Sequence, residues 1–144
     1  MSDKDKAFKA AQRRRLHTKI SGERKQLSSK RNELRSVNEK LERLRDAKRD
    51  LNSSLDDLTR LQSKTNTVLT SDLSKFVGTR QGKYDRKVKD VTSELSKING
   101  AHRANKELIN EKIKELEQKK SNLQGSISDL NDAISISMSE LGSL

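Results

Sequence analysis

Apolar residues recur in one unbroken heptad frame through the first half of the chain. Spacings of three and four residues alternate, which places the residues at positions a and d of a coiled-coil repeat over about six heptads. The residues that share this frame are Leu16, Ile20, Leu27, Leu34, Val37, Leu41, Leu44, Leu51, Leu55 and Leu58. Proline, which interrupts helices, is absent from all 144 residues. The pattern therefore predicts one long helix over about residues 6–65, with a narrow apolar stripe on one side.

Several polar residues share the same stripe. They are Glu23, Lys30, Lys48, Gln62 and Thr65. Polar groups at seam positions of a coiled coil fix its register and its choice of partner, and they lower its stability. We expect the first helix to be selective in how it packs rather than strongly stable.

The second half of the chain repeats the pattern and predicts a second helix over about residues 83–141. Its first frame is Tyr84, Val88, Val91, Leu95, Ile98, His102, Asn105 and Ile109. The pattern then jumps by four residues to Ile113, and a new frame follows: Leu116, Leu123, Ile127, Leu130, Ile134 and Leu141. Such a stutter unwinds a supercoil locally without ending the helix. Asn99-Gly100 is a turn signal, but the first frame continues across it, so we expect a weak point inside a continuous helix.

Residues 66–82 separate the two periodic arms and are rich in Thr, Ser, Asn and Gly, which compete with helical hydrogen bonding or loosen the backbone. Phe76 and Gly78 lie in this segment, which predicts a bend. The fold class expected is an all-α, extended antiparallel two-helix hairpin, with residues 1–144 as a single domain. Equal arms would place His102 and Asn105 near Leu51 and Leu55.

Composition supports an extended coiled coil over a compact globule. Hydrophobic residues make up 29% of the chain and charged residues 37%, which is too little apolar mass for an ordinary core. A disordered polar chain would have the same composition. The apolar residues are periodic, however, and this periodicity favours the coiled coil.

The net charge of +11 is concentrated in the first fifty residues, which carry 17 basic and 8 acidic groups. Arg13, Arg14 and Arg15 form the densest cluster, which Lys19, Arg24 and Lys25 extend. Phe8 is the one aromatic residue of this arm, and no base-reading element accompanies the cluster. A solvated helix face is favoured. Binding of nucleic acid or of an anionic surface through residues 9–49 stays an open alternative.

No constellation of catalytic or metal-binding residues emerges. Cysteine is absent, and His17 and His102 are far apart in sequence. Glu107, Glu111 and Glu115 recur at four-residue spacing, but lysines are interleaved with them, which is typical of a solvated face with ion pairs. We predict a protein that is not an enzyme and that has no catalytic residue, metal site, cofactor or small-molecule substrate.

The beginning of the chain has no apolar segment typical of a signal peptide, and no apolar run is long enough to span a bilayer. We therefore expect a cytoplasmic protein.

An aromatic-x-glycine bend followed eight residues later by an aromatic residue resembles the small WXG-motif helical hairpins of type VII secretion systems in Gram-positive bacteria. Phe76, Gly78 and Tyr84 are the matching positions. The greater length, the basic first arm and the long heptads are similar to the YwqH-like proteins encoded beside LXG-domain toxins. Phe76 stands where the family has tryptophan, and Val88 stands where secreted members have an acidic residue four positions after the tyrosine.

This resemblance implies a targeting chaperone that binds the long helical domain of an LXG toxin, keeps it soluble and presents it for export. Export of this chain together with its partner is an open alternative to a purely cytoplasmic location. A second small helical protein, a homodimer and a self-assembling structural coiled coil are further alternatives. The expected partner-binding residues are Leu34, Val37, Leu41, Leu44, Leu51, Leu55, Leu58, Phe76, Gly78, Tyr84, Val88, Val91, Leu95, Ile98 and Ile109.

Overall fold

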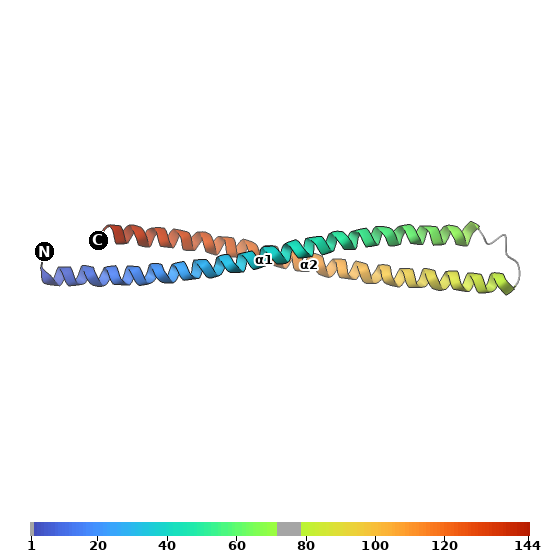
Figure 1. Ribbon diagram of the computed structural model, residues 1–144, viewed down its shortest axis with the longest axis horizontal. Helices are drawn as coiled ribbons and strands as arrows, with labels where there is room; N and C mark the ends of the chain where they lie inside the picture. Colours follow the sequence, from blue (N-terminus) through green and yellow to red (C-terminus); the bar gives the residue numbers. More distant parts are fainter. Residues whose placement is uncertain (1, 72–78) are drawn as a thin grey trace. The chain divides into compact units, whose positions relative to one another are not determined.

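The structure, a computed structural model, describes residues 2–71 and 79–144, and these ranges are almost entirely helical (Figure 1). Helix α1 spans Asp3–Ser71 and helix α2 spans Thr79–Gly142. The two helices pack against each other, and the described ranges contain no strand. The predicted all-α helical hairpin is therefore confirmed. Phe76 and Gly78, the predicted centre of the bend, lie outside the described residues.

Helix α1 begins at Asp3, three residues before the predicted start, because Ser2 and Asp5 cap it reciprocally. The Asp5 backbone N–H donates to the Ser2 hydroxyl oxygen at 3.2 Å, and the Ser2 N–H donates to the Asp5 carboxylate at 3.1 Å. The Ser2 hydroxyl also donates to that carboxylate at 2.7 Å. These hydrogen bonds, first that of the hydroxyl and then that of the backbone, lower the pKa of Asp5 below its ordinary value.

Helix α1 continues to Ser71, six residues beyond the predicted end, and α2 begins at Thr79 rather than near residue 83. The threonines that suggested a break are accommodated inside the helix. The Thr65 hydroxyl donates to the Leu61 carbonyl and the Thr67 hydroxyl to the Ser63 carbonyl, both at 2.9 Å. A threonine inside a helix can satisfy its hydroxyl on the carbonyl four residues earlier without ending the helix.

Helix α2 is continuous through both irregularities that the sequence contains. It crosses Asn99-Gly100 without a break. It also crosses the stutter between Ile109 and Ile113. Both positions were predicted to lie inside an unbroken helix, and both predictions are confirmed.

The contacts of the chain divide into two compact units. Unit 1 contains residues 1–41 and 115–144, and unit 2 contains residues 42–114. In unit 1, α1 and α2 enclose a well-buried apolar core. Its members are Ile20, Leu27, Val37, Leu41, Leu116, Leu123 and Ile134.

Unit 1 also contains a buried polar pair, Glu23 and Ser137. The Ser137 hydroxyl donates to Glu23 Oε1 at 3.3 Å, and Ser137 is completely buried. Glu23 Oε2 is buried without a hydrogen-bond partner. Lys19 approaches Oε1 only to 3.9 Å from an exposed position. Glu23 was predicted to be a polar seam residue, and its burial confirms that position.

The described part of unit 2 contains fewer buried hydrophobic residues than the described part of unit 1. Leu95 and Ile113 are its buried hydrophobic residues in the part that the structure describes. Leu55 of α1 and Asn99 and Arg103 of α2 line one shallow hollow, which agrees with the predicted register that places His102 near Leu55. In the two described ranges, no helix is both long enough and apolar enough to cross a membrane.

Candidate partner-binding site

The apolar residues of α2 in unit 2 fall into two columns that differ in burial. Leu95 is 7% exposed, whereas Val91 is 50% exposed and Ile98, seven residues after Val91, is 42% exposed. Residues seven apart on a helix lie on the same side of it. The side of α2 that carries Leu95 is therefore more buried than the side that carries Val91 and Ile98, which is largely open to solvent.

Helix α1 contributes a second open column to unit 2. Leu61 and Val68 are also seven residues apart and are 48% and 37% exposed. They occupy heptad position g, one residue before the a positions of the seam, so they widen the apolar face beyond the stripe that two helices need. Unit 2 therefore presents apolar surface on both helices.

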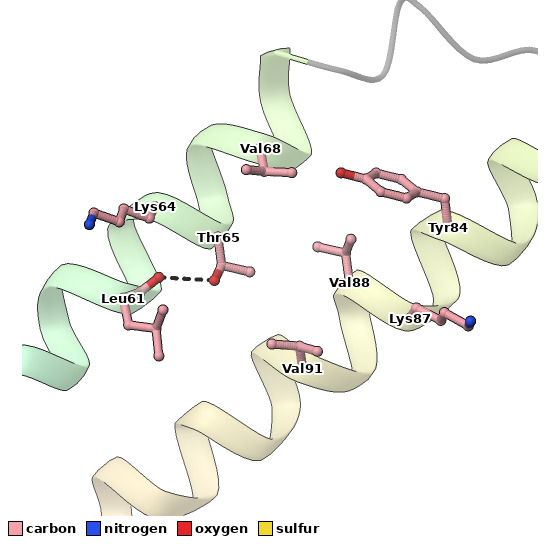
Figure 2. Close-up of a pocket in the computed structure, with 8 residues that line it drawn as sticks. All are labelled: Leu61, Lys64, Thr65, Val68, Tyr84, Lys87, Val88 and Val91. Carbon is pink, nitrogen blue, oxygen red and sulfur yellow. Dashed lines mark hydrogen bonds between the residues drawn. The ribbon is translucent and has the colours of Figure 1, made fainter.

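Val91 of α2 lines a groove together with Leu61 and Val68 of α1. We call it the bend-end groove, and it has a volume of about 410 Å³. Figure 2 shows that α1 and α2 line it from opposite sides, with the Tyr84 ring directed toward Val68. Its lining residues are Leu61, Lys64, Thr65 and Val68 from α1, and Tyr84, Lys87, Val88 and Val91 from α2.

The polar side chains of the bend-end groove leave its interior apolar. Because the Thr65 hydroxyl donates to the Leu61 carbonyl, the methyl group of Thr65 faces α2 (Figure 2). Lys64 and Lys87 contribute their aliphatic stems, and their ammonium groups point away from the groove on its two flanks (Figure 2). The arrangement is an apolar floor between two positive edges.

The structure distributes the predicted partner-binding residues unevenly. Val37, Leu41 and Leu95 are buried in the seam, and Val91 and Ile98 are exposed. Tyr84, Val88 and Val91 meet in the bend-end groove, whereas Phe76 and Gly78 lie outside the described residues. Tyr84 and Val88 are half-buried in this groove. The remaining predicted residues are also half-buried: Leu34, Leu44, Leu51, Leu55, Leu58 and Ile109.

Residues that line the groove from α1 were not among the predicted partner-binding residues. Leu61 and Val68 fall outside positions a and d, so the heptad frame did not select them. The sequence did contain a signal for them: they are seven residues apart and lie beside the seam. This spacing makes the apolar face of α1 wider than the stripe that packing of two helices requires. Thr65 was identified as a seam residue, but it was classed as polar. The contribution of its methyl group to the groove was therefore not predicted.

No cluster of three or more His, Cys, Asp or Glu side chains suited to a metal ion occurs in residues 2–71 and 79–144. The site is defined instead by apolar side chains on two packed helices with lysines beside them. These features place the chain in the class of helical hairpins that present an apolar surface. A comparison with protein-family models and with curated proteins finds no match for the chain.

Proposed function

We propose that this protein is a non-enzymatic binding partner of another helical protein. The observation that carries the proposal is the open apolar surface of unit 2, where Val91 and Ile98 of α2 and Leu61 of α1 are all more than 40% exposed. Removing such surface from water is the dominant favourable contribution to most protein association.

A third helix is the element best suited to cover this surface. Each helix of a two-helix pair buries one stripe, whereas both helices of unit 2 carry an additional apolar column. A helix laid along a groove between two others contacts both columns through residues at positions i, i+3 or i+4, and i+7. The partner supplies helical surface that the hairpin lacks.

The resemblance to YwqH-like proteins supports a more specific assignment. We propose that the partner is the helical targeting domain of an LXG-type toxin of a type VII secretion system. Binding would keep that domain soluble by covering its apolar face, and the complex would be presented for export.

Co-expression with the product of the neighbouring gene tests this proposal. We expect a neighbouring reading frame with a long helical N-terminal domain and a toxic C-terminal domain, and we expect the helical domain to co-purify with this chain. Replacing Val91 and Ile98 together with aspartate should reduce recovery of the complex at least tenfold, since two charges would have to be desolvated. Ile136→Asp is the control, because Ile136 is also an exposed apolar residue of a helix, at 58%, but lies in unit 1.

Circular dichroism of each variant establishes that the helices persist. Full recovery of the complex with the doubly substituted chain would contradict a role for the open surface of unit 2. Neighbouring genes for ribosomal or chromosome-maintenance proteins would contradict the toxin assignment.

A second candidate function is the binding of phosphate groups, and a basic hollow in unit 1 favours it. The hollow has a volume of about 470 Å³, and Arg24, Arg31 and Arg35 line it from one side of α1. Asn32 and Asn131 add amide groups. Arginine binds phosphate oxygens through paired N–H donors, so a polyanion is the ligand class that this hollow would take.

Binding to duplex DNA and to phosphatidylglycerol vesicles tests the second candidate. Raising salt from about 50 to 300 mM should weaken such binding by at least tenfold. Replacing Arg31 and Arg35 with glutamine should weaken it further at low salt. Binding to DNA alone identifies nucleic acid as the source of the phosphates, and binding to vesicles alone identifies a membrane surface. Unchanged binding by the glutamine variant would contradict a role for the hollow.

A further inference from the structure

We infer that the bend-end groove takes an amphipathic helix with an apolar stripe and acidic flanks. The inference rests on the proposed function, namely that this chain binds a helical protein, and it adds the chemistry of the segment that docks. Three observations support it: the length of the groove, its apolar floor and the charge around it.

The groove matches two turns of a docked helix. Leu61 and Val68 on α1 are seven residues apart, as are Tyr84 and Val91 on α2. Seven residues correspond to about 10 Å along a helix. A helix that presents apolar residues at positions i, i+3 or i+4, and i+7 covers the same length. Amphipathic helices bind apolar grooves through residues at this spacing.

The charge around the groove favours acidic residues beside the apolar stripe of a docked helix. Residues 60–71 and 79–91 contain seven basic and two acidic side chains. Lys64 and Lys87 stand on the two edges, and Arg80, Lys83 and Arg86 line an adjoining hollow with Tyr84 and Lys87. Aspartate or glutamate beside the apolar stripe of a docked helix would meet these cations and accelerate its association.

A second copy of this chain fits the groove less well than an acidic segment. The chain carries a net charge of +11, so pairing two copies at a positive groove would bring like charges together. Residues 101–144 carry six basic and seven acidic side chains and are nearly balanced. They would not supply the excess of negative charge that the groove favours.

Two designed peptides of about 20 residues test the inference without requiring the natural partner. Both carry leucines at the same i, i+3, i+4 and i+7 positions, and they differ in whether glutamate or lysine flanks the leucines. Fluorescence anisotropy of the labelled peptides against the full chain gives both dissociation constants. We expect the glutamate peptide to bind at least tenfold more tightly than the lysine peptide.

Substitutions in the chain then locate the binding site. Val68→Glu should weaken binding of the glutamate peptide at least tenfold, because it places a charge in the apolar floor. Exchanging both Lys64 and Lys87 for glutamate should weaken it by about three- to tenfold, since each exposed ion pair contributes modestly. Ile136→Glu, an exposed apolar position of unit 1, is the control and should change nothing.

The possible outcomes separate this inference from the proposed function. Equal affinity for the two peptides, or an unchanged affinity of Val68→Glu, would overturn the acidic-helix inference. A concentration-dependent dimer that Val68→Glu abolishes would also overturn it, by identifying a second copy as the occupant. If the glutamate peptide binds in the groove but the toxin domain does not bind the chain, the groove chemistry stands and the toxin assignment fails.

Discussion

Truncation of Leu41 to alanine is expected to lower the free energy of unfolding by about 3 kcal/mol, within the range measured for buried leucines. Leu41 is 1% exposed and belongs to the core of unit 1. Loss of its side chain therefore leaves a cavity that the neighbouring side chains fill only in part. Leu41→Asp should have a larger effect, because it also buries a charge without a partner.

Urea unfolding followed by circular dichroism at 222 nm measures the effect. Leu108→Ala is the matched control, because it deletes the same atoms from a helical leucine that is 63% exposed. We expect this control to change the free energy of unfolding by less than about 0.5 kcal/mol. Equal effects of the two alanine substitutions would show that Leu41 does not belong to a packed seam.

Replacement of Glu23 by leucine is expected to raise the free energy of unfolding by about 2 kcal/mol. Glu23 is 91% buried, Oε1 accepts one hydrogen bond from Ser137, and Oε2 has no partner. A buried carboxylate with so few compensating bonds loses its hydration without full replacement. Replacing a whole buried ion pair by packed apolar side chains is often neutral or stabilising by about 1–4 kcal/mol, and we expect a gain within this range here. We therefore expect the polar pair to weaken unit 1, and to favour the register in which Ser137 faces Glu23.

Glu23→Gln separates the cost of the charge from the cost of burying a polar side chain. It retains the length of the side chain and its hydrogen bond to Ser137, so we expect an intermediate stability. The same urea titration measures both variants. A decrease of more than about 1 kcal/mol in the free energy of unfolding for Glu23→Leu would contradict this expectation. It would show that the carboxylate stabilises the fold, as a member of a buried pair does when its removal leaves the other member without a partner.

The packing of the two helices could be predicted from the sequence because heptad periodicity reports directly which side of each helix is buried. Leu41, Leu95 and Leu116 were placed in the seam on spacing alone, and each is buried. The ends of the helices could not be located in the same way. Thr65 and Thr67 have low helix propensity, yet both lie inside α1 with their hydroxyls bonded to the preceding turn. A few residues of low propensity therefore do not define where a helix ends.

The open surface of unit 2 was only partly predictable. The heptad frame treats Val91 and Leu95 as equivalent, whereas the first is 50% exposed and the second 7%. Spacing defines which residues share a side of a helix, but it does not define how far each helix is rotated about its own axis against the other. That rotation depends on how all the side chains of the seam pack together, so it required the structure.

The identity of the partner depends on features beyond these helices. Leu61 and Val68 show that apolar surface is available, and Lys64 and Lys87 show which charge would complement it. The proposed LXG toxin partner is supported by the resemblance at Phe76, Gly78 and Tyr84, and the neighbouring gene tests it.

Hydrogen–deuterium exchange of the free chain and of its complex with the proposed helical partner domain tests the central claim most directly. In the free chain we expect slower exchange in residues 20–41 and 116–134 of unit 1 than in residues 58–71 and 84–98 of unit 2. In the complex, protection should rise chiefly in residues 58–71 and 84–98. A complex that forms with no change in these two segments would contradict the account.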